Sequence, residues 1–160
     1  MANERLVALV QNPALGAILL WRFCRGFQDE RPESLPCLPA VFCVLPIVYH
    51  GPTLRILRST LMPSGLVRFA TKLSEEREAL LAVHDRVLAM RGLTLESIAT
   101  GLAAGLLRIN YSNAEISGID EHPPIVPERL KDHHSGAEKL GRWFARLALS
   151  QALSALRIEV

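Results

Sequence analysis

The chain has 160 residues, of which 49% are hydrophobic and 21% are charged, and its formal net charge at neutral pH is +2. This length suits a single domain, and so apolar a composition excludes a chain that stays disordered on its own. Basic and acidic residues are intermixed along the sequence, without the basic stripe that is typical of strong nucleic-acid binders.

Aromatic residues make up only 6% of the chain, which favours a helical core of Leu, Ala, Val and Ile over an aromatic-rich sheet. Three cysteines, Cys24, Cys37 and Cys43, lie in apolar sequence without Cys-x-x-Cys spacing and predict buried thiols. The start of the chain lacks the basic start and long apolar run of a signal peptide. Residues 35–49 form the most apolar run, but prolines interrupt it, and it is shorter than the about 20 residues of a membrane span. We therefore expect a cytoplasmic protein that does not enter a membrane.

The first part of the chain, residues 1–60, is predicted to be helical. A short helix is expected over residues 3–11. A longer one should begin at Pro13, because Asn12 can cap it and proline fits the first helical position. Gly26 precedes a polar loop over residues 28–34, where that helix should end.

The run over residues 38–50 is apolar on all sides and should be central to the fold. We expect a helix that Pro46 kinks near Phe42, because proline removes one backbone hydrogen bond; a buried strand is the alternative. Short helices should follow over residues 53–58 and 64–73.

Two further helices and a β-hairpin are expected over residues 74–119. Ser74 should cap the first helix, over residues 75–90, and Gly92 should end it within a linker of about three residues, so that Thr94 caps the second. Alternating apolar residues on both sides of a polar turn then predict the hairpin. Helix, turn, helix and hairpin follow one another in this order in a winged helix.

The last part, residues 133–160, should hold a helix from about Ser135 to Leu147. Its tail, residues 150–160, could form a final helix turn and an edge strand, and the sequence leaves this open. A proline-rich stretch, residues 121–131, should lead into this part in an extended form. The expected fold class is mainly α with a small β-hairpin: one domain with a winged-helix-like core and extra N- and C-terminal helices.

No motif for catalysis, a cofactor or a metal stands out. Gly136 and Gly141 have the glycine spacing of a phosphate loop, but the Lys and Ser/Thr that such a loop needs do not follow. His133 and His134 are adjacent and would point about 100° apart on a helix, so they rarely share an ion and are expected at the surface. We therefore expect no catalytic residues, no cofactor and no metal site, and a protein that is not an enzyme.

The second helix of the winged-helix-like part lacks the basic residues of a DNA-reading helix. It is expected to present five residues outward: Glu96, Ser97, Thr100, Gly101 and Ala104. Such a surface would repel phosphate. Gly101 and Gly105 would let another helix approach closely, or would pack inside the domain. A stand-alone winged-helix DNA-binding regulator stays the alternative function, and it predicts duplex binding with a steep salt dependence.

Two segments set tryptophan beside arginine on a predicted helix. Residues 12–27 read NPALGAILLWRFCRGF, and residues 137–145 read AEKLGRWFA. Trp and Arg are enriched where a surface meets another protein. Because Trp143 and Phe144 are adjacent, one can face the core while the other faces outward, and Gly141 lets that face be approached; the alternative is that both tryptophans are core residues. The predicted partner-binding residues are Trp21, Arg22, Arg25, Glu138, Arg142, Trp143 and Arg146.

These segments, together with LPAVFCVLPIVYHGPT over residues 38–53, resemble the middle component of bacterial three-component ABC systems, which include Lamassu-type anti-phage and anti-plasmid systems. The resemblance covers nearly the whole chain and is weakest over residues 118–134. It implies an adaptor subunit of a hetero-oligomer, without catalytic activity. The partners it implies are an SMC-like ATPase with a long coiled coil and an effector, often a nuclease. DNA would be reached only indirectly, through the complex.

Overall fold

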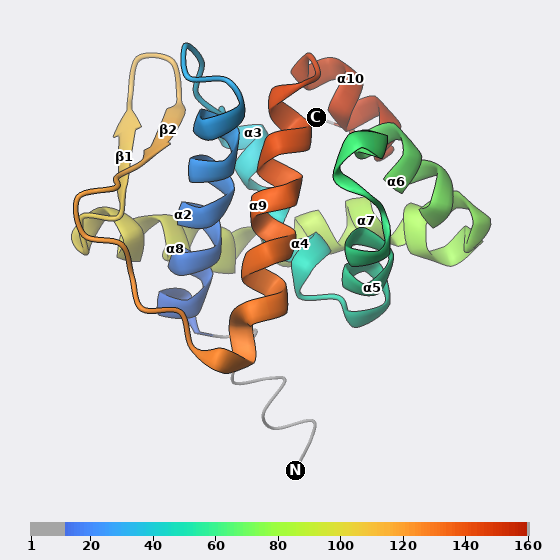
Figure 1. The fold of residues 1–160 in the computed structure, drawn as a ribbon, viewed down its shortest axis with the longest axis horizontal. Helices are drawn as coiled ribbons and strands as arrows, with labels where there is room; N and C mark the ends of the chain where they lie inside the picture. Colours follow the sequence, from blue (N-terminus) through green and yellow to red (C-terminus); the bar gives the residue numbers. More distant parts are fainter. Residues whose placement is uncertain (1–11, 160) are drawn as a thin grey trace.

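The computed structural model describes residues 12–159; the helix expected over residues 3–11 lies outside them. Two helices, α2 (Pro13–Glu30) and α9 (Lys131–Ala145), lie side by side at the centre (Figure 1). The other elements surround this pair: α3 (Leu38–Val41), α4 (Val44–Val48), α5 (Gly51–Ser59), η1 (Met62–Ser64), α6 (Gly65–Glu75), α7 (Arg77–Ala89), α8 (Arg91–Ala103), β1 (Leu107–Asn110), β2 (Glu115–Gly118), η2 (Glu128–Leu130) and α10 (Leu149–Ala155). The hairpin lies on one side of the pair, α5 and α6 lie on the other, and α7 and α8 run across the back.

The predicted start of α2 is confirmed. The side-chain oxygen of Asn12 accepts a hydrogen bond from the backbone N–H of Ala14 (3.0 Å), and Pro13 occupies the first helical position. The predicted end in the polar loop is confirmed, because the helix ends at Glu30, and Gly26 lies inside it. A glycine inside a helix costs only about 1 kcal/mol, which packing of the surrounding apolar residues readily exceeds.

The apolar run after the first loop is helical, as predicted, rather than a strand. It forms α3 and α4, which are separated at Phe42 and Cys43, close to the predicted kink. Every residue of α4 is buried. Among the helices of residues 12–159, none is by itself both long and apolar enough to cross a membrane; residues 38–48 and 51–59 meet these criteria only together, as a pair bent by 103°.

The helix boundaries predicted around the middle of the chain are only partly right. The two short helices after α4 are confirmed as α5 and α6. Ser74 does not cap α7 but lies inside α6, where its hydroxyl donates to the carbonyl oxygen of Thr71 (2.6 Å). Gly92 and Thr94 lie inside α8 rather than between two helices. Met90 alone separates α7 from α8, and the N–H of Thr94 donates to its carbonyl oxygen (3.0 Å), so the two helices follow one another without a glycine linker.

The predicted hairpin is confirmed. β1 and β2 pair in antiparallel register with Ile109 opposite Ile116. The side-chain oxygen of Gln28 in α2 accepts a hydrogen bond from the backbone N–H of Gly118 (2.7 Å), which ties the hairpin to the central helices. The described part of the chain is thus mainly helical with a two-stranded antiparallel hairpin, as expected. The winged-helix assignment of residues 74–119 stays a prediction.

The C-terminal part is helical on both sides of a short turn. α9 begins at Lys131, about one turn before the predicted start at Ser135. The tail contains α10, which ends at Ala155, and residues 156–159 do not form the edge strand. One apolar core joins residues from the central pair, α4, α6, α7, the hairpin and α10. The largest fully buried side chains include Trp143, Phe23, Phe69, Leu19, Leu20 and Leu45.

Two helices end in the same backbone motif with different residues at its left-handed position. After α8, Gly105 has φ = 72°, and the N–H of the next residue donates to the carbonyl oxygen of Gly101 (2.9 Å). After α10, Arg157 has φ = 54°, and the next N–H donates to the carbonyl oxygen of Leu153 (2.9 Å). Both are Schellman motifs, in which glycine is the usual residue because a side chain is strained at positive φ. Gly101 itself faces the side chain of Leu107, so it packs inside the chain rather than serving as a strip for another helix.

We expect Arg157→Gly to raise the free energy of unfolding by about 0.5 kcal/mol, because relief of the left-handed strain exceeds the entropy that glycine adds to the unfolded chain. Gly105→Ala, at the same position of the other motif, should lower it by about 1 kcal/mol. Urea unfolding followed by circular dichroism measures both values. A destabilising Arg157→Gly would show that the left-handed assignment at this residue is wrong.

Candidate functional site

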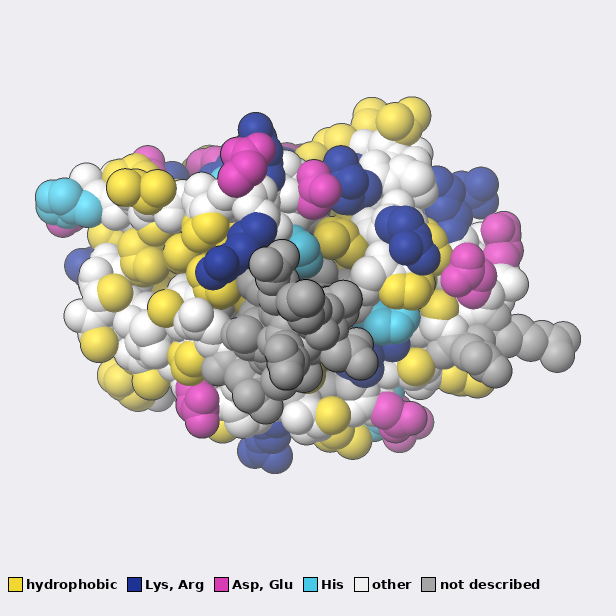
Figure 2. Space-filling model, turned by 90° about the horizontal axis from the view of Figure 1, so that it is seen from below, with side chains coloured by type: hydrophobic (Ala, Val, Ile, Leu, Met, Phe, Trp, Pro, Cys, Tyr) yellow, Lys and Arg dark blue, Asp and Glu magenta, His cyan; other side chains and the backbone are white. Residues whose placement is uncertain are grey.

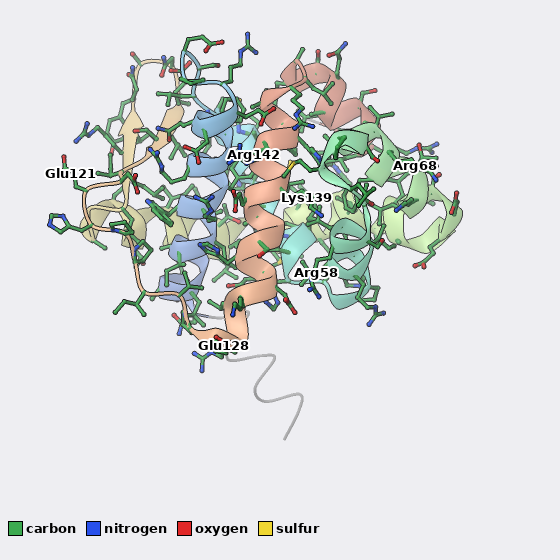
Figure 3. All side chains as sticks on the ribbon, in the orientation of Figure 1. Arg58, Arg68, Glu121, Glu128, Lys139 and Arg142 are labelled. Carbon is green, nitrogen blue, oxygen red and sulfur yellow. The ribbon has the colours of Figure 1, made fainter. Side chains whose placement is uncertain are left out.

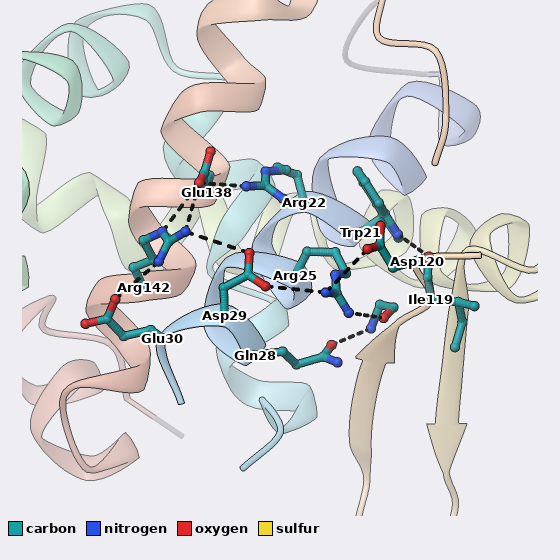
Figure 4. Close-up of polar contacts among 11 residues, drawn as sticks. Trp21, Arg22, Arg25, Gln28, Asp29, Glu30, Ile119, Asp120, Glu138 and Arg142 are labelled. Atoms are coloured by element: carbon teal, nitrogen blue, oxygen red, sulfur yellow. Dashed lines mark hydrogen bonds and ion pairs between the residues drawn. The ribbon is translucent and has the colours of Figure 1, made fainter. Parts of the chain in front are cut away.

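The two segments that set tryptophan beside arginine pack against each other. One segment lies on α2 and the other on α9, and these helices are in contact along most of their length (Figures 1 and 4). The predicted partner-binding residues all lie on this pair or directly after it: Trp21, Arg22, Arg25, Glu138, Arg142, Trp143 and Arg146. We call the charged residues between the helices the α2–α9 seam: Arg22, Arg25, Asp29, Glu30, Glu138, Arg142 and Arg146.

Two glycines let the backbones of α2 and α9 meet. A Cβ on Gly26 would lie 2.5 Å from the carbonyl oxygen of Glu138, and a Cβ on Gly141 would collide with the carbonyl oxygen of Phe23. Any side chain at either position therefore has to push the helices apart. The sequence correctly marked Gly141 as a point of close approach, but the helix that approaches it belongs to the same chain.

Ion pairs run along the seam, and two carboxylates each hold two arginines. Glu138 contacts Arg22 (2.6 Å) and Arg142 (3.3 Å), and Arg142 also contacts Glu30 (3.4 Å) (Figure 4). Glu30 in turn contacts Arg146 (2.7 Å). Arg142 thus connects both carboxylates, one from each helix. The pairs fix the relative position of the helices through side chains that are 17–35% exposed, so water screens part of their interaction.

Arg25 extends the seam to the hairpin. Its guanidinium contacts the carboxylate of Asp29 (3.3 Å), donates to the carbonyl oxygen of Gly118 (3.2 Å) and lies 3.8 Å from Asp120. The end of β2 is therefore held against α2 by a cation that also pairs with its own helix (Figure 4).

The arginines hold both central carboxylates ionised. A hydrogen bond from Arg146, supported by Arg142, keeps the pKa of Glu30 below its usual value. Burial pushes the pKa of Glu138 upward, but hydrogen bonds and attraction from Arg22 and Arg142 outweigh burial and lower it. Glu30 and Glu138 are thus ionised at neutral pH.

The outward orientation predicted for one residue of the Trp143–Phe144 pair is wrong, because both are buried, at 0% and 3% exposure. Trp21 is buried as well, at 5%. Each indole N–H finds its acceptor inside the chain: Trp21 donates to the carbonyl oxygen of Ile119 (2.7 Å) and Trp143 to that of Met62 (2.9 Å). A tryptophan buries its large apolar surface without cost when its N–H is satisfied in this way. Partner binding by the predicted set stays a prediction, and its charged members are the ones that a partner could reach.

Lys139 is a structural residue that the sequence reasoning missed. Its ammonium donates to three backbone carbonyl oxygens at the end of α5, the shortest bond being to Thr60 (2.8 Å), and it lies 5.8 Å from the ring centre of Trp143. Burial, with Arg58 and Lys72 nearby, lowers the pKa of Lys139. Figure 3 shows Lys139 and Arg142 on neighbouring turns of α9. Lysine side chains often bind the last carbonyl oxygens of a helix. Here Lys139 lies on α9 and the carbonyls end α5, which is distant in sequence, so no local sequence pattern predicts the contact.

The histidine pair at the start of α9 is half-buried rather than at the surface, which corrects the prediction. His133 packs edge-on against Tyr49, with ring centres 6.0 Å apart, and His134 lies 6.5 Å from the ring of Trp21. Nδ1 of His133 and Nε2 of His134 are buried without a hydrogen-bond partner among the described residues. Burial lowers the pKa of both imidazoles, and the charge of Arg22 lowers that of His134 further.

We expect the chain to lose stability when the pH falls from about 7.5 to about 5.5. The folded-state pKa values of His133 and His134 lie below the ordinary value of 6.5, so the unfolded chain takes up protons first. Stability is therefore full above about pH 6.5 and is lost progressively below it. Urea midpoints at both pH values measure the effect, and His133→Gln with His134→Gln should reduce the difference. An unchanged difference in this double variant would assign the pH dependence to other groups.

Other chemistry-bearing groups are either buried or dispersed. Cys24 and Cys43 are buried, as predicted, whereas Cys37 is only half-buried. Burial raises the pKa of the Cys24 thiol, and it raises that of Cys43 to about 12. Across residues 12–159, no three His, Cys, Asp or Glu side chains are placed to hold a metal ion together. Figure 2 shows one face of the molecule, on which basic, acidic, histidine and apolar side chains are intermixed.

The face of α8 that was predicted to point outward is only partly exposed. Glu96 and Ala104 face solvent, but Ser97 and Gly101 are buried and Thr100 is half-buried. The reason is that α8 packs this side against α2. The outward orientation predicted for Ser97 and Gly101 is therefore wrong, because both pack inside the chain.

The comparisons with known proteins give one family. Residues 2–160 match the family model described as ABC-three component (ABC-3C) system Middle Component 3. No curated protein and no solved structure matches the chain significantly. The family match spans the helix pair, the hairpin and α10, so it applies to the whole described fold.

Proposed function

Because this chain belongs to the ABC three-component system middle component 3 family, we propose that it is an adaptor subunit that joins an SMC-like ATPase to an effector. The effector is most simply a nuclease, and the complex acts in anti-phage or anti-plasmid defence of the Lamassu type in the cytoplasm. The observation that carries this proposal is the family match over residues 2–160, since a middle component is one of several in its system. The subunit itself is not an enzyme and reaches DNA only through the complex.

The α2–α9 seam is the surface that we assign to a partner. Its charged side chains are only partly covered, with Glu138 at 31%, Arg142 at 27% and Arg146 at 35% exposure. A partly desolvated row of both charge signs supports specific, oriented docking, because a partner with the matching pattern is steered to it and a mismatched one is repelled. The buried tryptophans hold this row in place from inside the chain.

Co-expression with the genomically neighbouring ATPase and effector tests the proposal. We expect a tagged chain to retain both components, and Arg146→Glu to weaken retention. Arg68→Glu is the matched control, because Arg68 is an exposed arginine on α6, away from the seam (Figure 3). Unchanged circular dichroism in both variants separates lost docking from lost folding.

Three outcomes contradict the proposal. Failure of the native chain to retain either component would remove the adaptor role. Full retention by a folded Arg146→Glu variant would show that the seam is not the contact surface. Tight duplex DNA binding by the isolated chain with a steep salt dependence would instead support the DNA-binding regulator.

A further inference from the structure

The solvent side of α7 and α8 carries leucines at a regular interval. Leu81 is 62% exposed, Leu88 is 58% exposed and Leu95 is 46% exposed, although large apolar side chains are normally covered. Seven residues correspond to about two helical turns, so residues at this interval share one side of a helix. Because Met90 alone separates α7 from α8, this side continues across the joint. We call it the leucine face.

Smaller residues lie between the leucines. Asp85, Gly92 and Ala99 are exposed, and each follows a leucine by four residues. Alternating intervals of four and three are the pattern of a helix that packs against a second helix along a narrow seam. The opposite side of the same helices already packs on the core, through residues such as Val83 and Ile98. α7 and α8 therefore have two apolar sides, and only one of them is covered within the described chain.

The leucine face is self-complementary about Leu88. Leu81 and Leu95 each lie seven residues from it, and Asp85 and Arg91, which carry opposite charges, each lie three residues from it. Asp85 and Arg91 are exposed and form no ion pair with another residue of the described part. If a two-fold axis passes at Leu88, Leu81 of one copy lies level with Leu95 of the other copy, and Asp85 lies level with Arg91.

We propose that the leucine face binds a second copy of this chain, with the two α7–α8 segments crossing in antiparallel directions at Leu88. The contact is isologous: Leu88 meets Leu88, Leu81 of each copy meets Leu95 of the other, and Asp85 comes within reach of the long side chain of Arg91. A crossing arrangement suits this pattern, because the leucines fill the centre while the two charges reach over it from opposite edges. The symmetric placement of leucines and opposite charges about Leu88 matches a second copy of the chain, whereas binding an unrelated protein does not require it.

A groove beside Leu88 can receive side chains of the second copy. It has a volume of about 330 Å³ and is lined mostly by apolar side chains, among them Leu38, Phe42, Val87 and Ile158. Leu88 and Arg91 lie on its wall, so the groove is continuous with the leucine face. Apolar side chains of the second copy therefore find a recess next to the axis rather than a flat surface. The proposal goes beyond the adaptor role and uses none of the residues of the α2–α9 seam.

Sedimentation equilibrium of the full-length chain tests the proposal. We expect a dimer in equilibrium with monomer, and Leu88→Arg to raise its dissociation constant more than about thirtyfold, because this substitution forces two like charges together at the centre of the contact. Leu61→Arg is the matched control, since Leu61 is 72% exposed and lies off this face; it should leave the constant unchanged. A chain that stays monomeric at every accessible concentration, or a dimer that tolerates Leu88→Arg, overturns the proposal.

An exchange of charges tests the antiparallel register. Asp85→Arg and Arg91→Asp should each raise the dissociation constant roughly two- to fivefold, and the double variant, which restores opposite charges, should recover the native value. If the effects of the two substitutions simply add, the pairing is wrong. If Leu88→Arg leaves the oligomeric state unchanged but prevents co-purification with the ATPase or the effector, the leucine face belongs to another component and the proposal is overturned.

Discussion

Gly141→Ala should lower the free energy of unfolding by about 3–5 kcal/mol, the range of severe steric disruption in a core. The added Cβ would collide with the carbonyl oxygen of Phe23, and its next neighbours would be backbone atoms of Phe23 and Phe27 at 3.0 Å. Backbone cannot rotate aside as a flexible side chain can, so the whole of α9 has to move away from α2. That movement also separates Glu138 from Arg22 and Arg142 from Glu30, the ion pairs that cross between the two helices.

Gly92→Ala is the matched control for this prediction, because Gly92 also lies inside a helix, and a Cβ there meets nothing within 4 Å. It should stabilise the chain by about 0.5–1 kcal/mol through helix propensity alone. Urea unfolding of both variants gives the comparison. Equal stabilities for Gly141→Ala and the native chain would mean that the two helices do not touch at this point.

Trp143→Ala should cost about 3–5 kcal/mol of stability in the isolated chain, without any partner present. The side chain is fully buried, contacts the ring of Phe69 with centres 5.8 Å apart, and donates its N–H to the carbonyl oxygen of Met62. Its removal leaves a large cavity and takes away one of the two hydrogen bonds that the carbonyl oxygen of Met62 accepts. Arg146 donates to the same oxygen (2.8 Å), so one hydrogen bond to Met62 remains.

Trp143→Phe separates the two contributions, since it keeps most of the apolar volume and loses the hydrogen bond; we expect a smaller cost of about 1–2 kcal/mol. Tyr111→Ala, at the 84% exposed tip of the hairpin, should change stability by less than about 0.5 kcal/mol. Thermal and urea unfolding of the purified variants provide the values. A native-like stability for Trp143→Ala would restore the interpretation of this indole as a surface residue that needs a partner.

The start of α2 and the hairpin turn could be predicted from the sequence, because residues close together in the chain determine both. Asn12 and Pro13 start α2 because the cap and the fixed proline φ act over a few residues. The hairpin turn was predictable for the same reason: the side-chain oxygen of Asn110 accepts from the N–H of Ser112 (3.0 Å), and that of Asn113 accepts from Glu115 (3.1 Å).

The helix boundary predicted at Gly92 was wrong, because Gly92 lies inside α8. A glycine weakens a helix by only about 1 kcal/mol, so a glycine alone does not decide where a helix ends. Gly26 shows the same tolerance, since it lies inside α2, where the backbone of α9 packs against it.

The partnership between the two tryptophan-bearing helices was hidden for a physical reason. Helical periodicity shows that a segment has an apolar side, but not which other segment covers it. Each segment carries a glycine, arginines and an acidic residue at its edge, so each is also complementary to the other. Counting Asp29 and Glu30 together with Glu138 would have supplied the carboxylates for the arginines within one chain.

α2 and α9 fold against each other inside this chain, and nuclear magnetic resonance of the isolated protein can detect this contact at Gly141. A nuclear Overhauser effect should connect the Hα protons of Gly141 with the amide proton of Phe27, because the Cβ position of Gly141 lies 3.0 Å from that nitrogen. We expect a strong cross-peak without any other component present. A folded chain whose Gly141 shows no cross-peak to α2 would contradict the packing of these two helices.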